Sequence, residues 1–241
     1  MEQQGYKLFE SPVLRQVTGE TLRPGGFFLT EKAIQFCSFA PGSKILDVGC
    51  GSGASVEFLR DRHQLKAVGV DPSSVLLESG KSRNPRLPLV QGYGERLPFS
   101  GEEMDGVFAE CTLSLMSDLQ KTVSEIYRVL KNDGLFVVND VYARNPEGVD
   151  RLRKLSISSC LRGALVKDEL ISLLEDEGFR ILHWEDHTKL LKQLTGQMIF
   201  KYGSMNNFWL KSTACTVDPN EAHLAMHEAK MGYFQLIAGK C

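Results

Sequence analysis

Short apolar runs alternate with longer amphipathic stretches along most of this chain. The runs are apolar on both faces and are bounded by turn residues, which is typical of buried parallel strands. The predicted strands cover 44–48, 66–70, 88–92, 105–110, 134–141, 180–187 and 232–240.

Helical periodicity fills most of the gaps between these runs. Residues 117–131, for example, place Leu119, Val123 and Ile126 on one apolar stripe. The other predicted helices cover 29–39, 54–62, 73–83 and 167–179. Alternating strands and helices predict an α/β fold, with a parallel sheet and right-handed crossovers.

No internal repeat or low-complexity linker divides the chain, so 1–241 is expected to form a single domain. Residues 1–40 form an N-terminal segment of helical character before the first strand. Residues 188–230 interrupt the alternation before the last strand, again with mixed helical character. We expect them to form a helical insertion, which is a candidate lid over a binding pocket.

Composition and charge narrow the class of protein. The 241 residues carry a net charge of −2, so no basic field attracts nucleic acid. No apolar run is long enough for a membrane span, and the first residues lack a signal-peptide pattern, which predicts a cytoplasmic location. Six scattered cysteines without a C-x-x-C pair predict neither a disulfide framework nor a metal site.

The stretch KILDVGCGSGAS is a glycine-rich loop after the first predicted strand. Gly49, Gly51 and Ala54 fit the dinucleotide fingerprint G-x-G-x-x-A. The same loop also fits D-x-G-x-G-x-G, with Asp47 and Gly53 added. Asp71 ends the second strand, where a carboxylate accepts hydrogen bonds from a ribose, but both interpretations share that ribose.

The segments that follow discriminate between the two interpretations. QGYGERLPFSGEEMDGVFA (91–109) and IYRVLKNDGLFVVNDVY (126–142) come after the loop and the strand-two acid in order. With them, residues 42–142 resemble the class I S-adenosylmethionine-dependent methyltransferases. The resemblance implies a Rossmann-like fold, with a mostly parallel seven-stranded sheet, helices on both faces and an antiparallel last strand. It also implies S-adenosylmethionine as the cofactor.

The resemblance assigns the cofactor-binding residues by position. Gly49, Gly51 and Gly53 would line the methionine and ribose part, with Asp47 below the methionine end. Asp71 would hold the ribose. The adenine would lie against Pro72, Tyr93, Gly94 and Glu95. The family often has Asp where Tyr93 stands, so Tyr93 would stack or donate its hydroxyl instead. Arg23, upstream of the fold, pairs with the cofactor's carboxylate or lies on the surface of a turn.

The methyl acceptor is expected to be a small molecule. An acceptor that must lose a proton needs a base, and Glu110, which ends the fourth strand, is suitably placed. Segments 109–120 and 158–179 also resemble arsenite methyltransferases, whose substrate is a thiol-bound metalloid. That resemblance matches Cys160 to one of their substrate cysteines and places Cys111 on the substrate side at a strand's carboxyl end, facing the cofactor, with Cys215 as a further candidate ligand. In each case the alternative is a small apolar filler.

Two other functions remain open from the residues alone. One is an NAD(P)-dependent oxidoreductase that uses the dinucleotide fingerprint. The other is a module that binds the cofactor without turning it over.

Overall fold

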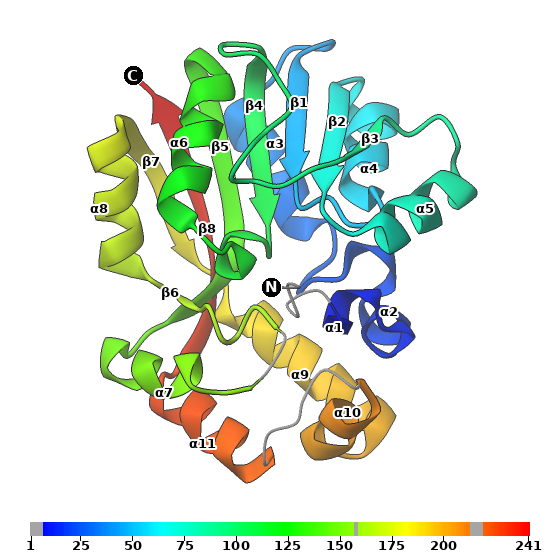
Figure 1. The fold of residues 1–241 in the computed structure, drawn as a ribbon, viewed down its shortest axis with the longest axis vertical. Coiled ribbons are helices and arrows are strands. Elements are labelled where there is room, and N and C mark those ends of the chain that lie inside the picture. The colour runs from blue at the N-terminus through cyan, green and yellow to red at the C-terminus, as the bar shows by residue number, and fades with distance from the viewer. Residues whose placement is uncertain (1–6, 157–158, 213–218) are drawn as a thin grey trace.

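The computed structural model describes residues 7–156, 159–212 and 219–241. Its centre is an eight-stranded sheet with the order β3-β2-β1-β4-β5-β8-β7, and β6 pairs with β5 (Figure 1). The strands are β1 (Lys44–Val48), β2 (Lys66–Asp71), β3 (Leu89–Gln91), β4 (Met104–Glu110), β5 (Leu130–Ala143), β6 (Leu165–Val166), β7 (Phe179–Asp186) and β8 (Met231–Lys240). The last strand, β8, runs antiparallel between β5 and β7, and the other pairs are parallel. This arrangement confirms the predicted α/β architecture.

Two details of the predicted sheet are wrong. The sheet has eight strands rather than seven, because the short β6 adds to the end of β5. Strand β5 also begins at Leu130, where the sequence predicted the end of a helix, and the ladder between β4 and β5 shifts register there. Asp133 has a left-handed φ of 61° within this irregularity. The residues between Leu130 and Leu135 therefore form a bulge within the long strand.

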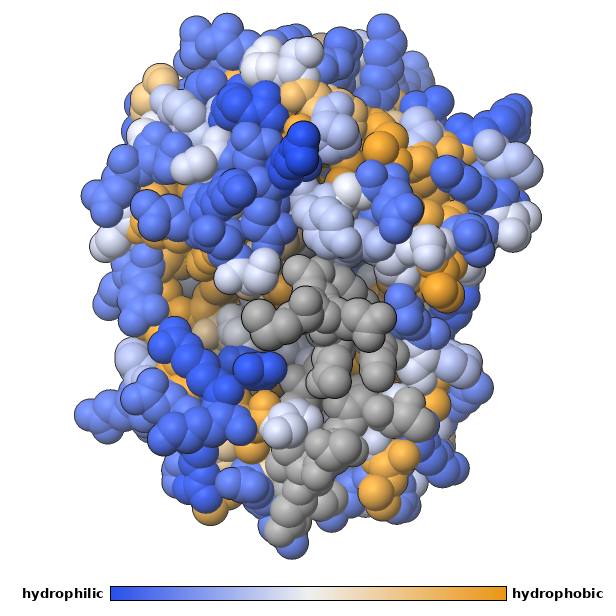
Figure 2. Space-filling view, viewed as in Figure 1, coloured by the Kyte–Doolittle hydropathy of each residue, from blue (hydrophilic) through white to orange (hydrophobic). Residues whose placement is uncertain are grey.

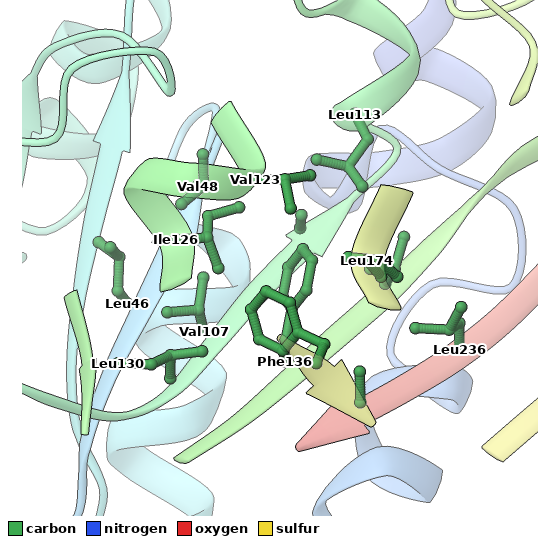
Figure 3. Close-up of a cluster of buried hydrophobic side chains, with 14 of the residues drawn as sticks. Leu46, Val48, Val107, Leu113, Val123, Ile126, Leu130, Phe136, Leu174 and Leu236 are labelled. Carbon is green, nitrogen blue, oxygen red and sulfur yellow. The ribbon is translucent and has the colours of Figure 1, made fainter. Parts of the chain in front are cut away.

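Helices lie on both faces of the sheet and beyond the carboxyl ends of its parallel strands. They are α1 (Lys7–Glu10), α2 (Pro12–Thr18), α3 (Phe28–Cys37), α4 (Ala54–His63), α5 (Ser74–Arg83), α6 (Leu119–Val129), α7 (Val149–Arg153), α8 (Lys167–Glu177), α9 (Thr188–Tyr202), α10 (Met205–Ser212) and α11 (Pro219–Glu228). Ile126 of α6 and Leu174 of α8 pack against Phe136 and its neighbours on one face of the sheet (Figure 3). Helices α3 and α4 pack on the opposite face.

A third apolar cluster lies beyond the carboxyl ends of the parallel strands. It joins the N-terminal helices α1 and α2 to α7, α9, α10 and α11, which extend below the sheet in Figure 1. Phe208 and Trp209 of α10 are its largest buried side chains apart from Tyr233 of β8. Segments from the start and the end of the chain therefore meet at the edge of the sheet where ligands usually bind.

The face of the molecule seen in Figure 2 is mainly polar, with apolar residues exposed in separate patches. No helix in the described ranges is both long and apolar enough to cross a bilayer.

Candidate functional site

The glycine loop leaves the carboxyl end of β1, between β2 and β4, where the strand order reverses. Gly49, Gly51 and Gly53 all have left-handed φ angles, of 74°, 55° and 76°. A Cβ on residue 49 would lie 2.2 Å from Oγ1 of Thr112. Only a glycine, which has no Cβ, therefore leaves room for the Thr112 side chain at this position. The loop thus brings bare backbone to the switch point of the sheet, where a ligand can approach closely.

Asp71 fixes this loop. Its Oδ2 accepts a hydrogen bond from the backbone N–H of Gly51 (2.8 Å), and its Oδ1 accepts one from Ser73 (2.8 Å). Burial raises the pKa of Asp71, while these two N–H donors act to lower it. A carboxylate has further lone-pair positions, so Asp71 can still accept hydrogen bonds from a ribose.

The glycine-loop cleft, the hollow between this loop and the ends of β2 and β4, gathers nearly all the residues predicted to bind the cofactor. It is lined by Arg23, Asp47, Gly49, Gly51, Asp71, Pro72, Tyr93, Gly94 and Glu95. Gly53 is the one predicted residue that is absent from this lining, although its neighbours Ala54 and Ser55 belong to it. Gly53 lies at the start of α4, where a Cβ would lie 2.7 Å from the side chain of Leu89, so packing also favours a glycine there. A contact between Gly53 and the cofactor stays a prediction.

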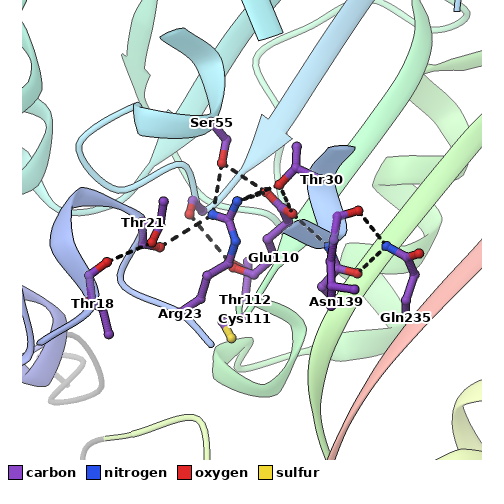
Figure 4. Close-up of polar contacts among 12 residues, drawn as sticks. Thr18, Thr21, Arg23, Thr30, Ser55, Glu110, Cys111, Thr112, Asn139 and Gln235 are labelled. Atoms are coloured by element: carbon purple, nitrogen blue, oxygen red, sulfur yellow. Dashed lines mark hydrogen bonds and ion pairs between the residues drawn. The ribbon is translucent and has the colours of Figure 1, made fainter. Parts of the chain in front are cut away.

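A buried ion pair closes the inner end of the cleft (Figure 4). Nη2 of Arg23 lies 2.8 Å from Oε2 of Glu110, and both side chains are almost completely buried. The prediction that Arg23 could lie on the surface of a turn is therefore wrong. The buried Nε of Arg23 has no hydrogen-bond partner among the described residues. An anionic ligand group in the cleft would satisfy that donor, so the residues present fit the carboxylate of S-adenosylmethionine.

Glu110 does not have the geometry of a general base. Its Oε1 accepts hydrogen bonds from Thr30 (2.8 Å) and Asn139 (2.7 Å). Its Oε2 accepts one from Ser55 (3.0 Å) besides the contact with Arg23. Four donors occupy the four lone-pair positions of the carboxylate, which leaves none for a substrate proton. The geometry instead makes Glu110 the anchor that orients Arg23, which corrects the expectation from the sequence.

Asp47 is buried beside this pair. Burial, reinforced by the charge of Glu110, raises its pKa to about 8, although Arg23 acts in the opposite direction. Asp47 is therefore mainly protonated at neutral pH and can donate a hydrogen bond at the floor of the cleft.

An apolar cavity of about 720 Å³ lies next to the cleft and reaches down between the terminal helices. Cys111 and Cys160 both line it. Burial raises the pKa of Cys160 to about 12 and that of Cys111 well above its usual value, so both are thiols at neutral pH. Sγ of Cys111 lies 3.3 Å from Oη of Tyr233. The predicted third cysteine, Cys215, lies outside the described residues.

The cleft and the apolar cavity share Phe9, Leu22 and Cys111. Two of these have left-handed backbone without being glycine, with φ of 53° at Leu22 and 59° at Cys111. Such conformations are strained and occur often at functional sites. Sequence reasoning found Cys111 through a motif, but it missed Phe9 and Leu22, because nothing local in the sequence distinguishes them from core residues.

Comparisons with known proteins agree on a family. Residues 46–138 match the methyltransferase domain family. An uncharacterized methyltransferase of Synechocystis is 32% identical over 152 residues, which cover 60% of this chain and 70% of that protein. The 24-methylenesterol C-methyltransferase 2 of rice is 27% identical over 63% of this chain, and the match spans 45% of the rice protein. The arsenite methyltransferase of Halobacterium salinarum is 28% identical over 60% of this chain and 39% of its own length.

Solved structures show the same fold. The [4+2]-cyclase SpnF superimposes with a TM-score of 0.77 at 22% identity, covering 99% of this chain and 94% of the cyclase. Phosphoethanolamine N-methyltransferase 2 of Haemonchus contortus, solved with S-adenosylmethionine, gives a TM-score of 0.71 at 18% identity and covers 97% of this chain and 56% of that one.

The family match and the sequence relatives decide between the two interpretations of the glycine loop, because those described above are methyltransferases and none is a nicotinamide-dependent oxidoreductase. One cleft brings together Asp47, the glycine loop, Asp71 and the segment from Tyr93 to Glu95, as the methyltransferase interpretation requires. The chain belongs to the class I S-adenosylmethionine-dependent methyltransferases, and S-adenosylmethionine is its cofactor.

Proposed function

We propose that this enzyme transfers the methyl group of S-adenosylmethionine to an apolar small molecule held in the apolar cavity. The observation that carries the proposal is the junction between the cavity and the glycine-loop cleft at Phe9, Leu22 and Cys111. A volume of about 720 Å³ lies within the range of sites for drug-sized ligands.

The chemistry of the cavity wall favours a carbon-rich acceptor. Leucine, methionine and aromatic side chains from α1, α2, α9, α10 and α11 line most of it, among them Leu194, Met198, Phe208 and Met226. Methionine suits such a wall because its flexible thioether adapts to irregular ligand shapes. Relatives named as sterol and quinone C-methyltransferases are consistent with this class of acceptor.

The residues of this chain would contribute alignment and exclusion of water. S-adenosylmethionine supplies the electrophilic methyl group, so the protein needs chiefly to hold the two reactants in line. Holding reactants in line contributes up to about 7–11 kcal/mol in ideal cases. Arg23 and the glycine backbone would orient the cofactor, and Leu22 and Cys111 would form the passage through which the acceptor reaches it. No carboxylate of the described residues lines the cavity, which favours acceptors that react without a carboxylate base.

A thiol-bound metalloid is a second candidate acceptor. It is favoured by the position of Cys111 and Cys160 in the wall of one cavity. The raised pKa values of both thiols count against it, because metalloid ligands are thiolates. Among the described residues, no group of three or more histidine, cysteine or acidic side chains is arranged to hold a metal ion.

The test offers tritiated S-adenosylmethionine with a panel of quinols and sterols, and separately with arsenite. We expect label in one of the organic acceptors, and we expect Cys160→Ser to retain this activity. The proposal would be overturned in favour of the metalloid by two results together. The wild-type enzyme would label arsenite but no organic acceptor, and Cys160→Ser would no longer label arsenite.

Gly196 offers a matched pair of variants for the cavity. It lies within α9, lines the cavity, and a Cβ placed on it meets no atom within 4 Å. Gly196→Phe should therefore fill part of the cavity and raise the KM for the acceptor, with unchanged affinity for S-adenosylmethionine. Gly196→Ala should preserve both. Gly196 is exposed and also borders a surface groove with Gln197 and Phe200, so an unchanged acceptor KM in Gly196→Phe would contradict acceptor contact at this end of the cavity only.

A further inference from the structure

The charges around the apolar cavity are all of one sign. Its lining includes a basic rim, formed by Arg144, Lys192, His223, His227 and Lys230, and no aspartate or glutamate of the described residues. All five rim side chains are exposed, so they stand at the mouth of the cavity rather than in its interior. The protein as a whole carries a net charge of −2, whereas the charged residues that line this cavity, Arg144, Lys192 and Lys230, are all cations, so the cavity departs from the average surface.

The rim is assembled from three separate segments. Arg144 follows β5, and its Nε donates a hydrogen bond to the backbone carbonyl of Lys230 (3.0 Å), which places the two residues together. His223 and His227 lie one turn apart on α11 and therefore share a face of that helix. Lys192 lies on α9. A charge pattern that converges from distant parts of the chain is not a consequence of local sequence composition.

The rim cations form no direct ion pairs with carboxylates of the described residues, although the charge of Arg144 acts at longer range to lower the pKa of Asp186. Within the described ranges, no carboxylate lies within ion-pair distance of Arg144, Lys192 or Lys230. The acid nearest to the rim in sequence, Glu228, is engaged by Arg151 at 2.8 Å instead. Cations of this kind at the mouth of an apolar cavity complement an anionic group on a ligand whose body lies inside.

We infer that the acceptor is amphiphilic, with an apolar body in the cavity and an anionic headgroup, a carboxylate or a phosphate, at the basic rim. The inference rests on the proposed function, because it adds a headgroup to the same acceptor whose apolar body is proposed to lie in the cavity. Arg144 offers the planar donor pair that suits either headgroup, and Lys192 and Lys230 add point charges.

The test measures calorimetric dissociation constants of the full chain, with S-adenosylhomocysteine present, for four probes that share one apolar chain. These probes are decanoate, decyl phosphate, decanol and decyltrimethylammonium. We expect both anions to bind about tenfold or more tightly than decanol, with an affinity that falls as salt is added. The tighter of the two anions then identifies the headgroup. The cationic probe should bind most weakly.

Charge reversal supplies the matched comparison. Lys192→Glu should weaken decanoate binding about tenfold, strengthen the binding of decyltrimethylammonium and leave decanol unchanged. Lys189→Glu is the control, because Lys189 is exposed on the same helix but does not line the cavity. It should change none of the constants.

The outcomes separate the two proposals. Decanol binding as tightly as both anions, or equal effects of Lys192→Glu and Lys189→Glu, would overturn the anionic headgroup and leave the apolar acceptor intact. Failure of all four probes to bind would overturn the apolar acceptor and the headgroup together.

Discussion

The glycine-loop cleft and the apolar cavity share three residues, yet their walls are made in different ways. Polar groups of the cleft are engaged with one another, as in the three hydrogen bonds and the ion pair around Glu110. Gly49 lies against the side chain of Thr112, which leaves no room for a Cβ. The cavity is instead lined by methionine, leucine and aromatic side chains from five helices and has open space at Gly196.

The difference corresponds to the tasks of the two sites. A constant cofactor benefits from fixed donors that need no rearrangement when it binds. An acceptor site of flexible apolar side chains can change its preference by substitutions that leave the cofactor site untouched. The cleft should therefore respond sharply to single changes, and the cavity should respond mildly.

The largest effect is expected at the ion pair of the cleft. Arg23→Met leaves Glu110 as an uncompensated buried charge, which should lower the free energy of unfolding by about 3–5 kcal/mol, measured by urea denaturation. The double variant Arg23→Met/Glu110→Gln should recover much of that loss. Arg83→Met is the control, because its pairs with Glu20 and Glu57 are partly exposed and should contribute at most about 1 kcal/mol. Equal losses of unfolding free energy in Arg23→Met and Arg83→Met would contradict the prediction that the buried ion pair of the cleft contributes more than an exposed one.

The next effect is expected at the glycine loop. Gly49→Ala adds a Cβ 2.2 Å from Oγ1 of Thr112 at a left-handed φ of 74°. The loop must shift, and we expect calorimetric affinity for S-adenosylmethionine to fall at least about a hundredfold, or about 2.7 kcal/mol. Gly42→Ala has a left-handed φ of 84° but no neighbour closer than 4.0 Å, so it tests strain without a clash. It should leave cofactor affinity unchanged.

A smaller effect is expected at the strand-two acid. Asp71→Ala removes both the predicted ribose contact and the hydrogen bond to Gly51, so affinity for S-adenosylmethionine should fall more than tenfold. Asp105→Ala removes a comparable contact, the hydrogen bond that its Oδ2 accepts from the backbone N–H of Lys44 (2.7 Å), at the amino ends of β1 and β4 opposite the cleft. This control should lose about 1 kcal/mol of stability without any change in cofactor affinity. Wild-type affinity in Asp71→Ala would remove this residue from the site.

The smallest effect concerns pH. The pKa of Asp47 is raised from 3.8 to about 8 in the folded protein, chiefly by burial. The folded state therefore binds this proton more tightly than the unfolded chain, and the contribution to stability falls as pH rises from about 4 to about 8. Asp47→Asn mimics the protonated acid, so its stability relative to wild type should rise across that window by at least about 1 kcal/mol.

Asp105 supplies a control of opposite sign for the pH measurement. Burial acts to raise its pKa, but hydrogen bonds from Lys131 and from the backbone of Lys44 lower it overall. Its contribution is present above about pH 4 and is lost as the pH falls through the lowered pKa. A pH dependence for Asp47→Asn that matches Asp105→Asn in sign would show that the floor of the cleft is solvated.

The sequence predicted correctly those parts of the molecule whose structure depends on residues that are consecutive in the chain. The strands, the glycine loop, Asp71 and the segment at Tyr93 are local patterns, so their place at one edge of a parallel sheet follows from the sequence alone. The errors arise where long-range contacts decide. The role of Glu110 depends on donors from Arg23, Thr30 and Asn139, which no local pattern joins.

The sequence by itself determined the α/β fold, because strand and helix periodicity are properties of short segments, and the order of its motifs over residues 42–142 indicated the cofactor that the glycine loop alone left open. Only the tertiary structure decided the acceptor site. The apolar cavity and its basic rim combine α1, α2, β5, α9 and α11, which meet because their apolar faces are buried together beyond the sheet. Burial is a property of the whole folded chain, so neither the volume of the cavity nor the sign of its rim could be derived from any one segment.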